Sequence, residues 1–122
     1  MGVIYSANSQ GFRMDVTSIG DVITVAYSTP ESLNSEDKYT LISQAGKFLI
    51  AHDAKYNNSC CGDDIYLSER TREAALRAMI KKVIRDCEID SPCGEQFPGD
   101  LKELEIKLEE KLLAEGTPTA TS

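Results

Sequence analysis

The stretch FRMDVTSIGDVITVAY, residues 12–27, decides the fold of the N-terminal part of the chain. Apolar and polar residues alternate along its first half, so that Met14 and Val16 fall on one face and the residues between them on the other. A period of two is typical of a strand with one buried face. Gly20 and Asp21 follow, and such a pair suits a two-residue hairpin loop because glycine tolerates positive φ. The second half is rich in β-branched residues and predicts a better buried, central strand.

A shorter apolar run extends this pattern toward the N-terminus. Residues 3–7 suit a strand, and the polar residues 8–11 that follow suit a turn. The sequence therefore predicts a three-stranded antiparallel meander over residues 2–28.

Residues 36–51 allow two interpretations. Five apolar residues at the spacing i, i+1, i+4, i+7, i+8 favour a helix, with Ser35 as its cap. These five are Leu41, Ile42, Ala45, Phe48 and Leu49. Against the helix, Gly46 sits in the middle, and residues 39–43 and 48–52 also fit two strands around a tight turn. We favour the helix and keep the hairpin as the alternative.

The C-terminal half is richer in helix signals. Residues 57–64 are polar and predict a loop, and residues 65–67 predict a short strand. The clearest helix follows, since six apolar residues lie along one continuous face. They are Leu76, Met79, Ile80, Val83, Ile84 and Cys87. A last helix is predicted to about residue 115, with Asp100 and Glu103 as a capping-box-like pair at its start and Gly116 at its end.

Together these elements predict an α+β fold, in which an N-terminal antiparallel β-meander packs against two or three C-terminal helices. A chain of 122 residues has the usual size of one domain. We therefore expect a single α+β domain over residues 1–116 and a disordered tail over residues 117–122.

Charge and composition restrict the class of protein. The formal net charge is −7, and on average such a surface repels nucleic acid and anionic lipid. The first residues lack the basic region and long apolar run of a secretory signal, and no stretch approaches the roughly 20 apolar residues of a membrane span. We expect a cytoplasmic protein with reduced cysteines and no membrane segment.

The charges are nevertheless segregated along the chain. Six of the 13 basic residues lie between positions 70 and 85, and the segment 86–115 is acidic in return. The six are Arg70, Arg72, Arg77, Lys81, Lys82 and Arg85. The spacing of Arg77, Lys81 and Arg85 places these three on one helical stripe. Such a basic face could hold an acidic partner or an anionic ligand, or it could be a solvated face paired with the last helix.

The last helix carries apolar residues on two sides. Leu104 and Leu108 belong to a stripe that can close the core, whereas Ile106 and Leu113 point away from it. Because a helix that is apolar on two sides is usually covered on both, we expect Ile106 and Leu113 to contact another copy of the chain in a homo-oligomer.

Catalytic and metal-binding signals are weak. The four cysteines are Cys60, Cys61, Cys87 and Cys93. Their spacing does not fit a zinc module, and Cys87 suits a small core residue on its helix. The one imaginable nucleophile–base pair is Cys61 with His52, the single histidine. The sequence carries neither a glycine-rich phosphate loop nor a Gly-x-Ser-x-Gly motif. We expect no cofactor and no metal.

Three functional hypotheses follow. The first is a non-catalytic, acidic interaction protein, a regulator or inhibitor that binds a macromolecular partner and self-associates. The second is a binder of an anionic nucleotide or metabolite, held by Arg70, Arg77, Lys81, Lys82 and Arg85. The third is a cysteine-dependent enzyme, which we consider the least supported of the three.

Overall fold

The computed structural model describes residues 2–31, 34–56, 59–89 and 97–116, with only the backbone described for residues 56, 59–68 and 114–116. Six strands come first and two helices follow. The strands are β1 (Val3–Ser9), β2 (Phe12–Ile19), β3 (Val22–Ser28), β4 (Asn34–Gln44), β5 (Lys47–Tyr56) and β6 (Ser59–Glu69). The helices are α1 (Arg72–Ile89) and α2 (Leu101–Gly116). The fold therefore belongs to the α+β class, as predicted.

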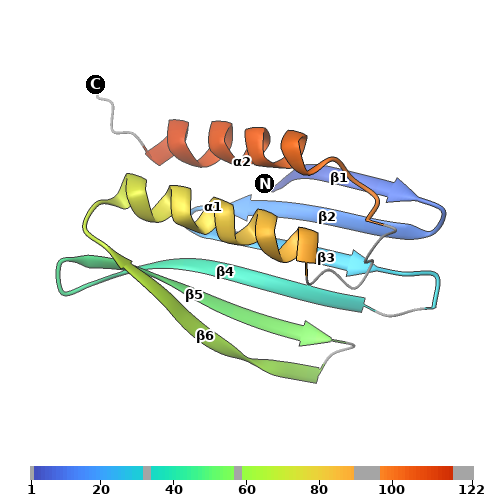
Figure 1. The fold of residues 1–122 in the computed structure, drawn as a ribbon, viewed down its shortest axis with the longest axis horizontal. Helices are drawn as coiled ribbons and strands as arrows, with labels where there is room; N and C mark the ends of the chain where they lie inside the picture. Colours follow the sequence, from blue (N-terminus) through green and yellow to red (C-terminus); the bar gives the residue numbers. More distant parts are fainter. Residues whose placement is uncertain (1, 32–33, 57–58, 90–96, 117–122) are drawn as a thin grey trace.

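The six strands form one antiparallel sheet in which the spatial order follows the chain order (Figure 1). The predicted meander over residues 2–28 is confirmed as β1, β2 and β3. Ile19 pairs with Val22 across the predicted Gly20–Asp21 turn, and Gly20 has the positive φ of 58° that this turn requires. The sheet continues for three more strands beyond the predicted meander.

The favoured helix over residues 36–51 is wrong, because this segment forms the hairpin of β4 and β5. Leu41 and Ile50 are opposite each other on the buried face, and Ile42 and Leu49 are opposite each other on the other face. With apolar residues on both faces, the alternation that marks a strand is lost and a helical spacing arises by coincidence.

The predicted loop over residues 57–64 is also wrong in large part. Residues 59–69 form β6, which pairs with β5 across two irregular steps in register. Residues 57 and 58 lie outside the described residues, and so does the tail 117–122 for which we predicted disorder. A strand at the edge of a sheet is held by backbone hydrogen bonds, so a polar composition does not exclude it.

The core lies between the sheet and the two helices, which run along the same face of the sheet (Figure 1). Alternate residues of the strands point toward the helices, and the apolar stripes of α1 and α2 meet them as the sequence predicts. The largest fully buried side chains include Met14, Tyr39, Leu76, Met79 and Leu108. Nothing in the described part of the chain covers the opposite face of the sheet.

Side-chain caps fix the start of each helix. The hydroxyl of Thr71 accepts the Ala74 N–H at 3.2 Å, and the Asp100 carboxylate accepts the N–H groups of Lys102 and Glu103 at 2.9 and 3.3 Å. Asp100 is thereby confirmed as the cap of α2. None of the described helices has the length and apolar character needed to cross a membrane.

Candidate functional site

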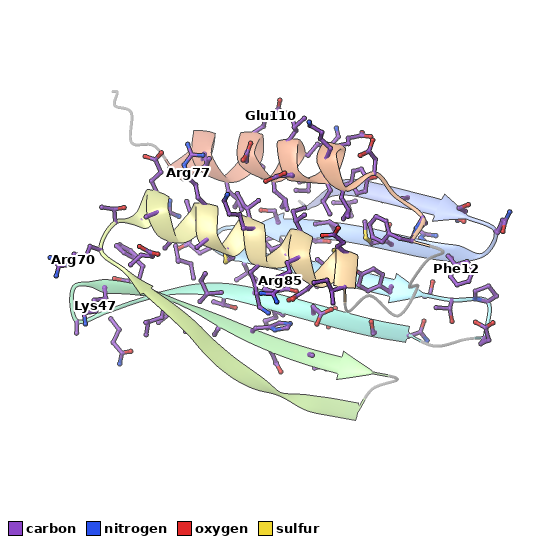
Figure 2. The ribbon with its side chains drawn as sticks, in the orientation of Figure 1. Phe12, Lys47, Arg70, Arg77, Arg85 and Glu110 are labelled. Carbon is purple, nitrogen blue, oxygen red and sulfur yellow. The ribbon has the colours of Figure 1, made fainter. Side chains whose placement is uncertain are left out.

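The outward side of α1 carries three of the six basic residues that the sequence singles out, Arg77, Lys81 and Arg85. Figure 2 shows Arg70 before the helix and Arg77 and Arg85 on it. Arg77 and Arg85 are eight residues apart in the sequence, which is about two helical turns. Arg77 donates to Glu73 at 3.1 Å, so its charge is partly compensated within the helix. Arg70, Lys81 and Arg85 are exposed and form no ion pair with any residue that the structure describes.

Lys82 does not belong to this outward surface. Its side chain is 23% exposed and its ammonium donates to the buried Asp86 at 3.0 Å. Arg72, another of the six basic residues, pairs with Asp21 at the β2–β3 turn. Three of the six basic residues, Arg72, Arg77 and Lys82, therefore form ion pairs within the chain. On the helix, Lys81 and Arg85 form no ion pair with a described residue.

Under α1 lies a buried polar cluster that the sequence did not predict. The Tyr39 hydroxyl donates to Asp86 at 2.6 Å, and the Tyr39 and His52 rings stack with their centroids 4.4 Å apart. His52 Nε2 lies 2.9 Å from Asp37, and His52 Nδ1 lies 4.0 Å from Asp86. With Lys82, the cluster holds two carboxylates, one imidazole, one phenol and one ammonium, contributed by β4, β5 and α1.

Electrostatics make Tyr39 a donor rather than a base. Burial raises the pKa of its phenol, and the hydrogen bond to Asp86 and the charge of Asp37 raise it further. The phenol therefore keeps its proton and stabilises the Asp86 carboxylate. Because the groups of this cluster form hydrogen bonds and ion pairs with one another, we interpret the cluster as a structural contact, or tie, that holds α1 against the β4–β5 hairpin.

One signal for this cluster was available in the sequence. Asp86 occupies a position of the α1 stripe that otherwise carries buried apolar residues, three residues after Val83 and seven after Met79. A carboxylate placed there needs a hydrogen-bond partner from the sheet. The partner, Tyr39, lies in the segment that we expected to be helical.

The other predicted site residues are distributed as follows. Ile106 is 46% exposed on α2, whereas Leu113 is partly buried and packs against the core. Cys87 is buried, and its thiol accepts a hydrogen bond from the Tyr27 hydroxyl at 2.8 Å, which confirms it as a core residue. Cys60 and Cys61 lie in the part of β6 whose side chains are not described, and Cys93 lies outside the described residues.

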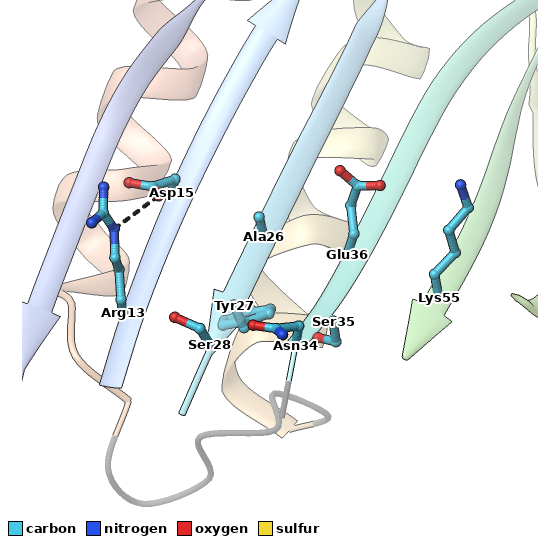
Figure 3. Close-up of a pocket in the computed structure, with 9 residues that line it drawn as sticks. All are labelled: Arg13, Asp15, Ala26, Tyr27, Ser28, Asn34, Ser35, Glu36 and Lys55. Carbon is cyan, nitrogen blue, oxygen red and sulfur yellow. Dashed lines mark hydrogen bonds and ion pairs between the residues drawn. The ribbon is translucent and has the colours of Figure 1, made fainter. Parts of the chain in front are cut away.

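A shallow groove of about 410 Å³ lies on the opposite side of the sheet from the helices (Figure 3). Arg13, Asp15, Glu36 and Lys55 stand around it. Within the described residues, no group of three or more His, Cys, Asp or Glu side chains is arranged to hold a metal ion. Comparison with known protein families, curated proteins and solved structures finds no match to this chain.

Proposed function

We propose that the protein is a non-catalytic binding protein, a regulator or inhibitor, that holds an acidic patch of a partner protein against the outward side of α1. The single observation behind this proposal is the pair formed by Lys81 and Arg85. Both are exposed, they lie one helical turn apart, and neither forms an ion pair with a described residue.

Two like charges at positions i and i+4 of a helix repel each other, which costs about 0.2–0.5 kcal/mol. A carboxylate bound between them relieves this repulsion and makes charge-assisted hydrogen bonds to both side chains. The free protein therefore carries a small electrostatic cost that a bound acidic group removes.

The net charge of −7 favours a protein partner over a polyanion. A nucleic acid extends its phosphates beyond any local basic surface and meets the acidic remainder of the chain. A folded protein can present two or three carboxylates at one place and basic or apolar groups elsewhere. The partner expected here is a protein with a compact acidic patch.

The test uses the double variant Lys81→Glu/Arg85→Glu as bait for affinity capture from a lysate of the source organism. The double variant Lys102→Glu/Lys107→Glu is the matched control, because these two lysines are exposed on α2 and the change in net charge is the same. We expect a protein captured by the wild type and by the α2 control, and captured at least tenfold less by the α1 variant. Its retention should fall as salt rises.

Equal capture by all three baits, or no capture at low salt, would contradict the proposal. Thermal melts with a panel of nucleotides address the small-ligand hypothesis in parallel. A nucleotide that raises the melting temperature of the wild type but not of the α1 variant would show instead that Lys81 and Arg85 bind a nucleotide.

A further inference from the structure

The sheet has a face without helices, which we call the outer face. It consists of the alternate residues of β2 to β5 that point away from the core, and the pairing register sorts them into rows across the strands. The first row holds Asp15, Ala26, Glu36 and Lys55, from β2 to β5 in that order. The second row holds Thr17, Thr24, Lys38 and Asp53, and the third row holds Ile19, Val22, Thr40 and Ala51. The fourth row holds Ile42 and Leu49.

The outer face is graded from charged to apolar along the strands. Charged side chains occupy the first two rows, whereas the last two rows are apolar apart from Thr40. Ile19 at the apolar end is 63% exposed. An ordered apolar patch that is bordered by charges is typical of a surface that contacts another protein.

The charged end is hollowed. The groove of Figure 3 has the small side chains Ala26 and Ser28 at its floor, with Arg13 on one side and Glu36 and Lys55 on the other. Glu36 and Lys55 are cross-strand neighbours, yet they form no ion pair with each other or with another described residue. Both charges therefore lack an ion-pair partner among the residues whose side chains the structure describes.

We propose that a second copy of this chain packs on the outer face, sheet against sheet, about a two-fold axis that runs parallel to the strands between β3 and β4. Such an axis keeps each row opposite the same row of the second copy. It places β2 opposite β5 and β3 opposite β4. Two sheets that pack face to face keep their strands within about 30° of each other, which agrees with this axis.

The charges of the first row match under this operation. Asp15 on β2 comes opposite Lys55 on β5 of the other copy, and the symmetry makes this pair twice. Glu36 comes opposite Ala26, so its carboxylate enters the groove of the other copy beside Arg13. The hollow of each copy thus receives a charged side chain of the other.

The apolar rows match as well. Val22 comes opposite Thr40, and Ile19 comes opposite Ala51, so apolar or methyl-bearing side chains meet across the third row. A two-fold axis perpendicular to the strands would instead bring the charged rows against the apolar ones and desolvate charges without partners. The grading of the outer face therefore selects the axis parallel to the strands.

The strand spacing gives the size of the outer face. The six residue steps from Arg13 to Ile19 span about 20 Å, and the four strands β2 to β5 span about 14 Å, so the outer face covers on the order of 300 Å² in projection. The relief of the side chains raises the accessible area above the projected one. Standard protein interfaces bury about 800 Å² per partner, so an interface confined to β2 to β5 belongs to the small interfaces, and its charge pairs must supply the specificity.

This assembly leaves both helices of each copy on the outside. The basic sides of the two α1 helices then face opposite directions, and the dimer presents two equivalent outward surfaces. The inference does not depend on the proposed binding function, since it uses residues of the sheet alone. It assigns self-association to the outer face, whereas the sequence led us to expect it at Ile106 and Leu113.

A charge swap tests the interface. We expect a dimer by sedimentation velocity at micromolar concentration, and a rise of the dimer dissociation constant of roughly tenfold or more for either Asp15→Lys or Lys55→Asp alone. The double variant Asp15→Lys/Lys55→Asp restores the pair in the opposite sense, so the dimer should return. Because Asp15 also accepts hydrogen bonds from Ser6 and Arg13 within the protomer, restoration by the double variant is the decisive reading.

Ile106→Asp on α2 is the control, and it should leave the dimer intact. A wild type that sediments as a monomer at 100 micromolar would overturn the proposal. A dimer that both single outer-face variants leave unchanged and that Ile106→Asp dissociates would overturn it as well, and would assign the interface to α2.

Discussion

Replacing Tyr39 by Phe is the sharpest probe of the tie between α1 and the sheet. The substitution keeps the ring that stacks on His52 and removes only the hydroxyl that donates to Asp86 at 2.6 Å. Tyr39 is 1% exposed and Asp86 7%, so water does not readily replace the lost donor. A hydrogen bond to a charged acceptor contributes about 1.5–3 kcal/mol. Because Asp86 keeps the ammonium of Lys82, we expect a loss of about 2 kcal/mol in unfolding free energy.

Urea unfolding followed by circular dichroism measures this loss. Tyr27→Phe is the matched control, because its hydroxyl donates to the uncharged thiol of Cys87, and it should cost less than Tyr39→Phe. A loss below about 0.5 kcal/mol for Tyr39→Phe would refute the idea that the phenol stabilises a buried carboxylate.

The same pair of proteins gives a pH signature. Burial and the neighbouring carboxylates raise the pKa of Tyr39 in the folded state, whereas in the unfolded chain it ionises near pH 10. Above pH 10 the unfolded state releases a proton that the folded state retains, so the contribution of Tyr39 to stability is complete below pH 10 and falls as pH rises. The difference between wild type and Tyr39→Phe should shrink from about 2 kcal/mol at pH 8 to about 0.6 kcal/mol at pH 11. A difference that is constant over this range would show that Tyr39 ionises in the folded protein.

Two further substitutions test local geometry. Ala45 has a φ of 54° in the β4–β5 turn, and an L-residue in this conformation is destabilised by about 1–2 kcal/mol. Glycine removes this strain but has a greater entropy in the unfolded chain, so Ala45→Gly should raise the free energy of unfolding by about 0.5–1 kcal/mol and increase the urea midpoint. A lower urea midpoint would contradict this prediction. Gly99→Ala should lower the free energy of unfolding by about 1–2 kcal/mol, because the new Cβ would lie 2.7 Å from the Tyr5 hydroxyl. This hydroxyl accepts the Asp100 N–H, so its displacement would also weaken that hydrogen bond. An unchanged melting temperature would show that the Tyr5 side chain moves without loss of stability.

The parts of the fold that could be predicted are those in which one face is buried and the other is not. The alternation around Met14 and the stripe of α1 from Leu76 to Cys87 meet this condition, and both are confirmed. The β4–β5 hairpin does not meet it, since Ile42 and Leu49 add apolar side chains to the outer face. The turn of this hairpin is also difficult to predict, because Ala45 is a strong helix former and yet adopts a positive φ, which is usual for Gly, Asn or Asp.

The candidate site was predictable only where it depends on a single helix. The spacing of Lys81 and Arg85 fixes their relative direction whatever they pack against. The Tyr39–Asp86 contact joins residues 47 positions apart and needs the register of β4 and the placement of α1 together. A helical interpretation of residues 36–51 removes the register of β4, so periodicity alone could not predict this contact.

The rotation of α1 about its own axis nevertheless determines both the buried cluster and the basic side of the helix. Asp86 can be buried only where Tyr39 and Lys82 satisfy it, since an unpaired carboxylate in the core is strongly destabilising. Neighbouring helix positions differ by about 100°, so a rotation by one residue would move Asp86 away from Tyr39 and turn a basic residue toward the core. The polar contacts thus favour the rotation of α1 that leaves Lys81 and Arg85 exposed and without an ion pair to any described residue. The sheet therefore influences, through Tyr39, which charged side chains of α1 are exposed to solvent.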